Sequence, residues 1–529
     1  MKKITVFVFA AAAVLCLFLF TGCKRAKLSA ETDPHKYLSF ELQQDDTYAV
    51  TGFSSAPVKD PVVPAVHNGK KVDAVAPNAF SYYGYDDEWI HSSVYLHGHF
   101  HGLRLTELEY GTITIEDGIR IIGNDFINVQ KSGTFLCTAK KIILPDSIEY
   151  IGDYAFNGTG AEINYPSSVK KVGSYAFTQS KLYGDITLKG EEISIGAFSY
   201  TDITSVDFSV PYDEIPHDCF TGCGSLKEVT LSVADTSLGK KFAYCPIEKI
   251  NLNNAENAFL SCGCLVVEEE GEKILVLGSG NYTYSDEITK IGEYAFSGRK
   301  FKADKVEFKV NDMCENAFDR AEANEIYSEV SDTVGRYCFY GVVCDTLTVK
   351  AGTLGWSSLM CRAKKLKILT EDVDTDQFGG SYYKGDAQVE ELEFLEGCER
   401  ITSSRAFTGC ATLKKIILPA SMRSIAETAF QECGDLTEIY YNLKNGEPLY
   451  LDAEIFCYNG LTFKPSYDKY GGFSLTDGTR KINSKLKIYV YDSVAESCKK
   501  AWSNKAVVHY GSDEIVLPAL SERVKIKKD

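Results

Sequence analysis

The densest group of reactive side chains in this chain is the run His97-Gly98-His99-Phe100-His101, with His91 shortly before it. If the run is a strand, alternate residues share one face, so His97, His99 and His101 could present three imidazoles to a zinc or copper ion. The simpler interpretation is a polar insertion with solvated histidines, because nothing in the sequence fixes the distance to a carboxylate ligand. We therefore expect no cofactor, with a divalent metal at this insertion as the alternative.

A second motif, the acidic run Asp372-Val373-Asp374-Thr375-Asp376, begins like a calcium-binding loop. Calcium-binding loops of this type need a glycine at the sixth position, for a sharp turn, and a bidentate glutamate at the twelfth. Here these positions are Gln377 and Tyr383. A solvated turn is the better interpretation. The sequence also has no nucleophile elbow, phosphate-binding loop or cysteine–histidine signature, so we predict a protein that is not an enzyme and has no catalytic residue. An enzyme that uses the histidine insertion is the alternative.

The cysteines could form disulfides or a repeated buried row. The chain has 17 cysteines, and setting aside Cys16 and Cys23 leaves 17 − 2 = 15, an odd number. Five of them fall three residues after a recurrent aromatic residue: Cys223, Cys245, Cys262, Cys410 and Cys433. A cysteine at one fixed place per repeat is expected to be a small buried hydrophobic residue. The alternative is one or more disulfides, for which the better candidates are Cys219, Cys338, Cys344 and Cys498.

All these groups are carried on a repeated unit of about 22 residues. The segment Ala139–Phe156 contains Lys-Lys-Ile-Ile-Leu-Pro-Asp-Ser-Ile before its final Ala-Phe, and Thr412–Phe430 contains Lys-Lys-Ile-Ile-Leu-Pro-Ala-Ser-Met before its own. A unit this small must stack on its neighbours to bury its apolar face, so we predict a repeat solenoid, mostly β with irregular loops. The aromatic residue that closes each coil is expected in the core: Phe80, Phe156, Phe177, Phe198, Phe220, Phe259, Phe296, Phe318, Phe339, Phe407 and Phe430.

Each unit also contains an alternating apolar triplet, such as Ile142-Ile143-Leu144. Its outer two side chains enter the core and the middle one faces solvent, which predicts one short strand of a parallel ladder per coil. The middle residues would form a row on one face: Ile143, Asn164, Thr187, Asp207, Thr230, Asn251, Glu307, Tyr327, Thr348, Lys367, Glu393, Ile417, Tyr440 and Tyr489. We predict that this row is a ligand-binding face, and the alternative is that it is merely solvated. On the opposite wall, Glu315 and Asp319 are expected to face solvent beside the buried Ala317-Phe318.

The repeat pattern Leu-x-x-Ile-x-Leu-Pro-x-Ser-Ile/Val-x-x-Ile-Gly-x-x-Ala-Phe-x-x-Cys resembles the BspA-like, or treponemal-type, leucine-rich repeat family over nearly the whole chain. Cys264–Thr283 is similar to the β-hairpin often interposed in that family, and Lys487–Val490 with Ala501-Trp502 is similar to its C-terminal cap. The resemblance implies leucine-rich-repeat-like coils and adhesion to matrix proteins or to other bacteria.

The predicted organisation follows the chain in six segments. They are 1–22, a lipoprotein signal peptide; 23–35, an acylated tether; 36–261, a first repeat block with an N-terminal cap and the His-rich insertion; 262–290, a β-hairpin insertion; 291–460, a second repeat block; and 461–529, an insertion and a C-terminal capping segment.

The first 23 residues indicate an exported protein. Lys2 and Lys3 precede an uncharged run, Ile4–Phe20, which ends in Thr-Gly-Cys. This pattern is typical of a lipoprotein signal, in which Cys23 becomes the acylated first residue. A transmembrane anchor is the alternative, although the run is barely long enough to span a bilayer.

Charge and length restrict the partners. The net charge is −17, and removal of Lys2 and Lys3 with the signal makes it −17 − 2 = −19, which disfavours nucleic acid. We therefore predict a monomeric lipoprotein, membrane-anchored on the bacterial cell surface. It would be an adhesin-type protein binding a host matrix protein or a partner-cell surface, glycan included. The alternative is an envelope scaffolding lipoprotein that engages another envelope protein.

Overall fold

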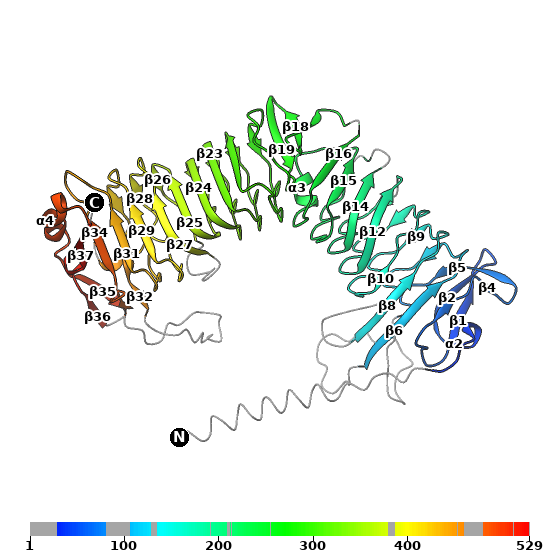
Figure 1. Cartoon of the computed structure of the whole chain (residues 1–529). Coiled ribbons are helices and arrows are strands. Elements are labelled where there is room, and N and C mark those ends of the chain that lie inside the picture. Colours follow the sequence, from blue (N-terminus) through cyan, green and yellow to red (C-terminus); the bar gives the residue numbers. More distant parts are fainter. Residues whose placement is uncertain are drawn as a thin grey trace, which may run out of the picture. The chain divides into compact units, whose positions relative to one another are not determined.

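The computed structural model describes residues 29–80, 106–127, 135–190, 192–208, 212, 214–253, 255–378, 387–451, 453–459, 480–510 and 513–527. The chain forms two compact units, which divide between Val233 and Ala234, and Figure 1 follows the strands of each in chain order. The predicted signal peptide, Cys23 and the histidines His97, His99 and His101 lie outside the described residues, so the lipid anchor and the metal site stay predictions.

The first unit is built from coils whose short strands pair in two ladders. Helix α2 (Pro34–Tyr37) precedes them. One ladder has the order β1 (Leu38–Leu42), β2 (Tyr48–Phe53), β5 (Lys70–Val75), β7 (Ile121–Ile122), β9 (Tyr150–Ile151), β11 (Lys171–Val172) and β13 (Glu192–Ile193), with β4 (Val66–His67) beside β5. The other has the order β3 (Val62–Val63), β6 (Thr106–Ile115), β8 (Phe135–Ile143), β10 (Glu162–Ile163), β12 (Lys181–Leu188), β14 (Asp202–Phe208) and β15 (Glu228–Leu231).

The second unit has one long sheet and several short elements. The sheet has the order β17 (Ala258–Ser261), β18 (Cys264–Glu269), β19 (Glu272–Leu277), β20 (Lys290–Ile291), β22 (Asp312–Met313), β23 (Glu325–Val334), β24 (Val343–Leu354), β25 (Arg362–Leu369), β27 (Gln388–Phe394), β29 (Lys415–Leu418), β31 (Glu438–Tyr441), β34 (Lys487–Val490) and β37 (Val524–Ile526), and β21 (Lys305–Val310) pairs with β23. A smaller ladder has β26 (Asp372–Val373), β28 (Arg400–Ile401) and β30 (Ser424–Ile425). The remaining elements are α3 (Leu238–Lys241), β16 (Lys249–Leu252), η2 (Ala453–Phe456), β32 (Tyr458–Asn459), β33 (Arg480–Lys481), α4 (Asp492–Ala501), β35 (Ala506–Tyr510), β36 (Asp513–Leu517) and η3 (Leu520–Arg523).

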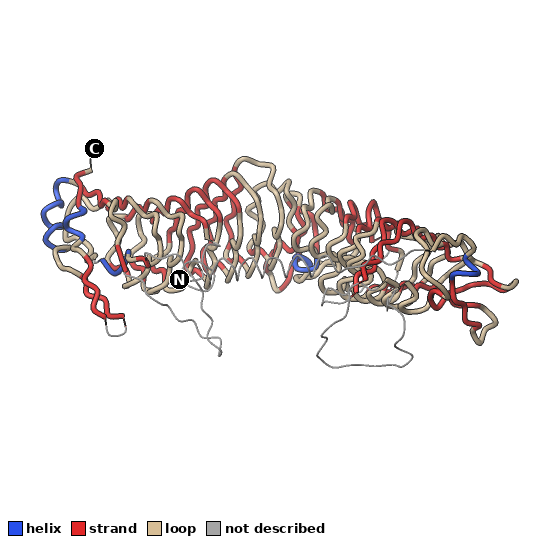
Figure 2. Tube along the Cα trace, turned by 90° about the horizontal axis from the view of Figure 1, so that it is seen from below, coloured by secondary structure: helices blue, strands red, loops and turns tan. Residues whose placement is uncertain are grey.

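Most of these strands are parallel, as the repeat predicts, and Figure 2 shows them recurring along the coils with loops between them. In the first unit's ladder from β1 to β13, two-residue strands such as β9 (Tyr150–Ile151) are too short to show a period in the sequence. Helices are few and short, and the part of the chain that the structure describes has no helix long and apolar enough to cross a membrane.

The core of each unit contains a column of phenylalanine rings, one in most coils, and Met360 takes this place in one coil of the second unit. Phe177 is fully buried, and its ring centroid lies 5.2 Å from that of Phe156 and 5.7 Å from that of Phe198. In the second unit the ring centroid of Phe318 lies 5.1 Å from that of Phe296 in the preceding coil and 5.1 Å from that of Phe339 in the following coil. Such stacked rings combine a large buried apolar area with a favourable aromatic geometry, so the column holds successive coils together.

The Ile-Gly dipeptide of the repeat has a steric cause. A Cβ atom added to Gly152 would lie 2.5 Å from the backbone nitrogen of Asn124, and one added to Gly173 would lie 2.5 Å from that of Asp153. Because these are backbone atoms of the preceding coil, no side chain fits there. Glycine therefore sets how closely successive coils approach.

The cysteines form a buried row of free thiols. The Cys223 thiol donates to the carbonyl oxygen of Phe198 at 3.1 Å, and the Cys433 thiol donates to that of Phe407 at 3.4 Å. Cys245 and Cys410 are buried as well, whereas Cys262 is half-buried. Free thiols include those of the disulfide candidates Cys219, Cys338, Cys344 and Cys498, among the cysteines whose side chains the structure describes.

The interposed segment is a pair of tight hairpins. β17, β18 and β19 are antiparallel, and their connections are Cys262-Gly263, with φ of 47° and 76°, and Glu270-Gly271, with φ of 52° and 84°. Two successive positive φ values are the signature of two-residue turns that match the twist of the strands. Phe259 lies in β17 and is half-buried, so its expected place in the phenylalanine column is wrong. The Ala-Phe pair belongs here to a hairpin strand.

The C-terminal end of the second unit is covered by α4 and the tryptophan that follows it. Trp502 is 1 % exposed, and its indole Nε1 donates to the carbonyl oxygen of Leu449 at 2.7 Å. Val494, Ala495 and Cys498 are buried from the same helix. This cap covers the apolar interior of the coil that contains Leu449.

Candidate functional site

In the second unit, the outward residues predicted from the triplets lie in one continuous register. Glu307 pairs with Tyr327, and the pairing continues strand by strand across β24, β25, β27, β29, β31, β34 and β37. We call this set the outward row: Glu307, Tyr327, Thr348, Lys367, Glu393, Ile417, Tyr440, Tyr489 and Lys525. All are partly exposed or exposed except Thr348, which is 7 % exposed. The row crosses nine strands and is rigidly held by the sheet.

Tyr327 is fixed between two lysines of neighbouring strands. The Lys305 and Lys350 ammonium groups each lie 5.2 Å from the centroid of its ring, and its hydroxyl donates to a Glu329 carboxylate oxygen at 3.0 Å. Cation–π contacts of this kind contribute about 0.5–1 kcal/mol at an exposed site. Tyr327 therefore orders two lysines on the face as well as presenting its own ring edge.

Tyr440 and Tyr489 form the aromatic end of the outward row. Their rings are stacked at 4.6 Å with an interplanar angle of 12°, and the Lys415 ammonium lies 4.9 Å from the centroid of the Tyr440 ring. Burial, with the neighbouring Glu438 carboxylate, raises the pKa of the Tyr440 hydroxyl. Lys487 and Lys525 are exposed beside this pair. The result is a small aromatic surface edged by cations.

A row of alternating charges runs beside the outward row, two residues earlier on each strand. Its register is Lys305, Glu325, Thr346, Lys365, Glu391, Lys415, Glu438 and Lys487. Lys365 and Lys415 lie 2.6 Å and 3.1 Å from Glu391. Burial alone would raise the pKa of Glu391, but the hydrogen bonds from these two lysines hold it below its usual value. The charges of this row largely form ion pairs with one another.

The first unit continues the predicted row only in part. Thr187 pairs with Asp207, and Asp207 pairs with Thr230. Ile163, however, pairs with Leu182 rather than Ile186, so the register does not join the Asn164 position to Thr187. Strand β12 has eight residues, and its register with β14 shifts between Gly184 and Asp185, where Thr204 of β14 is the extra residue. The triplet pattern cannot reveal this shift.

Three further residues of the predicted row have particular places. Asn164 bonds to the backbone of the preceding coil: its amide donates to the Leu144 carbonyl oxygen at 2.7 Å, and its side-chain oxygen accepts from the Leu144 N–H at 2.9 Å. Ile143 is 38 % exposed on β8. Asn251 lies in β16 of the second unit and is half-buried.

Two aspartates of the acidic run, Asp372 and Asp376, form hydrogen bonds within the protein. The Asp372 carboxylate accepts from Arg400 Nε at 3.2 Å and from the Thr402 hydroxyl at 2.9 Å, and Asp376 accepts from the Ser403 hydroxyl at 2.7 Å. Within the described residues no three histidine, cysteine or carboxylate side chains gather as metal ligands.

On the opposite wall, Asp319 is 4 % exposed and accepts from the Tyr244 hydroxyl at 2.6 Å, so its expected exposure is wrong.

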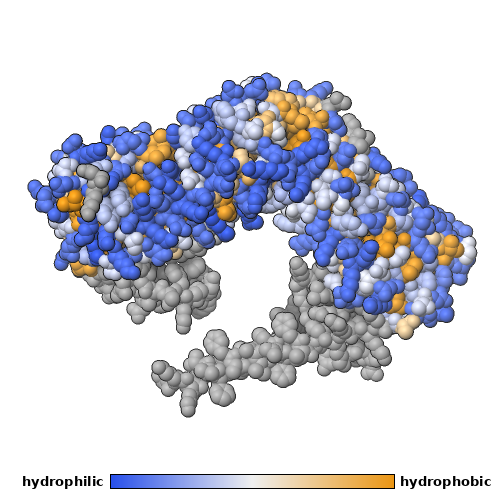
Figure 3. Space-filling view, in the orientation of Figure 1, coloured by the Kyte–Doolittle hydropathy of each residue, from blue (hydrophilic) through white to orange (hydrophobic). Residues whose placement is uncertain are grey.

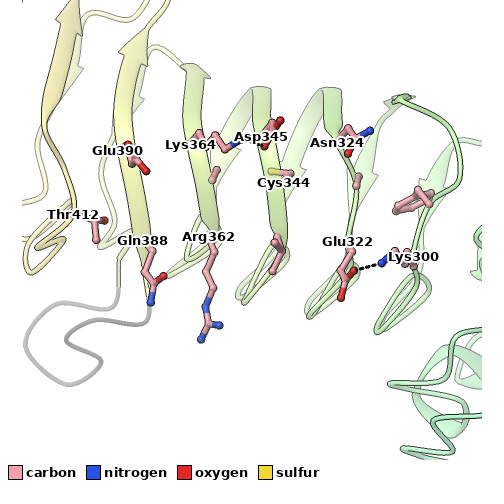
Figure 4. A pocket seen from close by; sticks show the side chains of 14 residues that line it. Lys300, Glu322, Asn324, Cys344, Asp345, Arg362, Lys364, Gln388, Glu390 and Thr412 are labelled. Atoms are coloured by element: carbon pink, nitrogen blue, oxygen red, sulfur yellow. Dashed lines mark ion pairs between the residues drawn. The ribbon is translucent and has the colours of Figure 1, made fainter.

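Two grooves edge the outward row, and the sequence pattern does not indicate either. One, of about 460 Å³, lies where β24, β25 and β27 begin, and its lining is shown in Figure 4. The other, of about 610 Å³, lies at the opposite ends of β21, β23 and β24 and includes Lys309, Glu329 and Lys350. Most of the visible surface of both units is hydrophilic, with scattered hydrophobic patches (Figure 3).

The sequence profile of the BspA type leucine rich repeat region matches six copies, over residues 128–196, 191–265, 279–353 and 376–461. The chain belongs to this family of BspA-type leucine-rich repeat proteins. A search of curated protein sequences finds no match.

Solved structures of bacterial leucine-rich repeat proteins are similar at low identity. A leucine-rich repeat protein from Bacteroides ovatus ATCC 8483 is 17 % identical with a TM-score of 0.38, covering 78 % of this chain and 89 % of its own. A leucine rich cell surface protein from Faecalibacterium prausnitzii A2-165 is 16 % identical with a TM-score of 0.38, covering 79 % and 99 %. The pneumococcal vaccine antigen PcpA is 14 % identical with a TM-score of 0.32, covering 96 % and 100 %.

Proposed function

We propose that this protein is a lipoprotein of the bacterial cell surface that binds a macromolecular ligand without catalysis. The ligand would be a protein of the host matrix or of a partner cell's surface. The observation that carries the proposal is the outward row of the second unit, which runs in register from Glu307 to Lys525. A rigid row of mixed tyrosine, lysine and glutamate side chains provides many adaptable contacts at a low entropic cost.

The row is suited to binding because its side chains are held in place before a partner arrives. Tyr327 lies between two lysines, and Tyr440 lies between Lys415 and Tyr489. Preorganised side chains lose little conformational freedom on binding, so more of the contact energy is retained as affinity. The membrane attachment is proposed from Cys23 and the apolar run before it.

Two measurements test this function. Protease treatment of intact cells should remove the protein, since it would face outward, whereas an envelope scaffold that faces inward would resist. The full chain, purified in detergent and immobilised, should then retain at least one member of a panel of purified extracellular-matrix proteins in a surface-binding assay. Resistance to protease on intact cells would favour the scaffolding function, and retention of no panel member would remove the matrix-binding function.

A further inference from the structure

The groove at the start of the second unit's strands has a regular construction. Its outer wall has one side chain per coil, in backbone register: Lys300, Glu322, Val343, Arg362 and Gln388. Its inner wall is formed two residues later by Asn324, Asp345, Lys364 and Glu390. Figure 4 shows these two lines of side chains along successive strands.

The residues between the two walls are small and make the floor. Ala323, Cys344 and Ala363 lie there, with Phe301 at one end, and Cys344 and Ala363 are 6 % and 2 % exposed. Burial raises the pKa of the Cys344 thiol to about 12, so it behaves as a hydrophobic residue. The floor residues lie deeper than the exposed residues of both walls. The groove therefore runs along the ladder and crosses several strands. A linear, extended ligand fits such a shape.

Most charges along the groove are already paired. Lys300 lies 3.0 Å from Glu322, and Lys364 lies 2.7 Å from Asp345. Glu390 accepts from Lys414 at 2.9 Å. These pairs leave little charge on the walls for a partner.

Arg362 is the exception on the outer wall. Its guanidinium has no hydrogen-bond or ion-pair partner within the described ranges, its side chain is exposed, and in Figure 4 it extends away from the Asp345–Lys364 pair. A second hollow, of about 290 Å³, shares Glu322, Val343 and Arg362 with the groove and adds Arg320. Arg320 is itself largely exposed and lies 3.8 Å from a carboxylate oxygen of Asp319. The junction of the two hollows is therefore cationic on an otherwise acidic chain.

An exposed aliphatic residue stands beside this cation. Val343 is 46 % exposed and is the direct backbone neighbour of Arg362 on the adjoining strand. A carboxylate bound by Arg362 would place the next part of its own chain over Val343 and the small residues of the floor. The groove presents aliphatic surface for that contact, and its one ring in the floor, Phe301, is 7 % exposed.

We propose that this groove binds an extended polypeptide segment in which an acidic side chain pairs with Arg362 and a neighbouring apolar side chain covers Val343. A guanidinium matches a carboxylate with two parallel hydrogen bonds, which gives both affinity and orientation. The aliphatic floor favours a peptide over a glycan, because sugars stack on exposed aromatic faces. A phosphate backbone is disfavoured by Glu322, Asp345 and Glu390 on the walls. The inference deepens the proposed binding function and rests on it.

The test pans a phage library of random peptides on the full chain in detergent. The enriched peptides should carry Asp or Glu next to an apolar residue. A synthetic copy should bind at least about 10-fold more weakly to Arg362→Ala in a fluorescence titration, because a charge-assisted pair is lost. Val343→Asp should weaken binding similarly by placing a like charge beside the carboxylate. Arg405→Ala, which removes another exposed arginine of the same unit, should bind as the wild type does.

Three results would overturn the inference: no enriched peptide, enriched peptides without acidic residues, or equal binding by Arg362→Ala and wild type. Binding of an acidic oligosaccharide in place of peptides would also overturn it. The proposed function is judged separately. If a matrix protein still binds Arg362→Ala but not a variant of the outward row, then that function stands and only the groove's assignment falls.

Discussion

Tyr440 on β31 and Tyr489 on β34 stack face to face at 4.6 Å, although a long insertion separates them in the sequence. Neighbouring strands of a parallel ladder bring residues of one register together whatever the length of chain between them. The stacked pair therefore adds to the outward row, next to Lys525, an aromatic surface that two segments distant in sequence build jointly.

We predict that Tyr327→Ala combined with Tyr440→Ala weakens binding of a matrix protein more than about 10-fold, since interface tyrosines commonly contribute 1–2 kcal/mol or more each. The thermal melt should fall less than for a change in the buried core, because each lost stacking or cation–π contact is worth about 0.5–1.5 kcal/mol and lies on a partly exposed face. The measurements are a binding titration and a melt on the same preparations. Tyr450→Ala, a change at a tyrosine that is 57 % exposed, is the matched control and should bind normally. Normal binding by the double variant would place the ligand elsewhere.

Phe177→Ala should destabilise the first unit by about 3–5 kcal/mol, the usual cost of removing a buried ring where the cavity cannot collapse. Phe177 is fully buried between Phe156 and Phe198. Denaturant unfolding would measure the loss, and hydrogen exchange should show faster opening of the neighbouring coils first. A melt within a degree of wild type would contradict this role.

Arg120→Ala should cost about 1–2 kcal/mol at neutral pH, with the guanidinium's partial exposure keeping the loss small. Arg120 donates to the buried Asp73 carboxylate at 2.8 Å and 2.7 Å and holds the pKa of Asp73 below its usual value. Because the folded-state pKa is lowered, this stability is present above the unfolded pKa and is lost as pH falls through the folded one. Denaturation at pH 7 and pH 3 should therefore show a smaller gap between variant and wild type in acid. An equal gap at both values would contradict the linkage.

Tyr244→Phe should destabilise the second unit by about 1–3 kcal/mol at neutral pH, because the buried Asp319 carboxylate loses its donor. Burial raises the pKa of Asp319, so its charged form is already disfavoured in the folded state. Because the folded-state pKa is raised, the carboxyl is neutral and costs no stability at pH values below its unfolded pKa. Stability is lost as pH rises through the folded-state pKa and the buried group becomes charged. The loss should therefore be larger at pH 7 than at pH 3 when unfolding is measured at both. A loss that did not depend on pH would mean that the hydroxyl matters only through packing.

Cys23→Ser should leave an unprocessed precursor and release the protein from the membrane fraction, because the thiol is the predicted acylation point. Metabolic labelling with a fatty-acid analogue, followed by fractionation, would show the label in the wild type alone. A processed Cys23→Ser chain that still partitions to the membrane would remove the lipoprotein assignment.

The sequence by itself determined the coil, its core and most of the second unit's outward row. The reason is that these features are local: the alternation around Ile416 and Leu418 and the fixed position of Phe430 follow from strand geometry and from a period of about 22 residues. A residue such as Tyr327 could be placed on the face because its own neighbours fix its direction.

Only the tertiary structure decided the relations between coils. It placed Phe259 in a hairpin, paired Ile163 with Leu182, and buried Asp319 under Tyr244. It also left Arg362, at the edge of a groove, without an ion-pair partner among the residues that the structure describes. Each of these depends on which residue of another coil lies opposite, and a bulge or an extra strand changes that register without changing the local pattern. The repeat therefore specifies each coil, while stacking specifies the site.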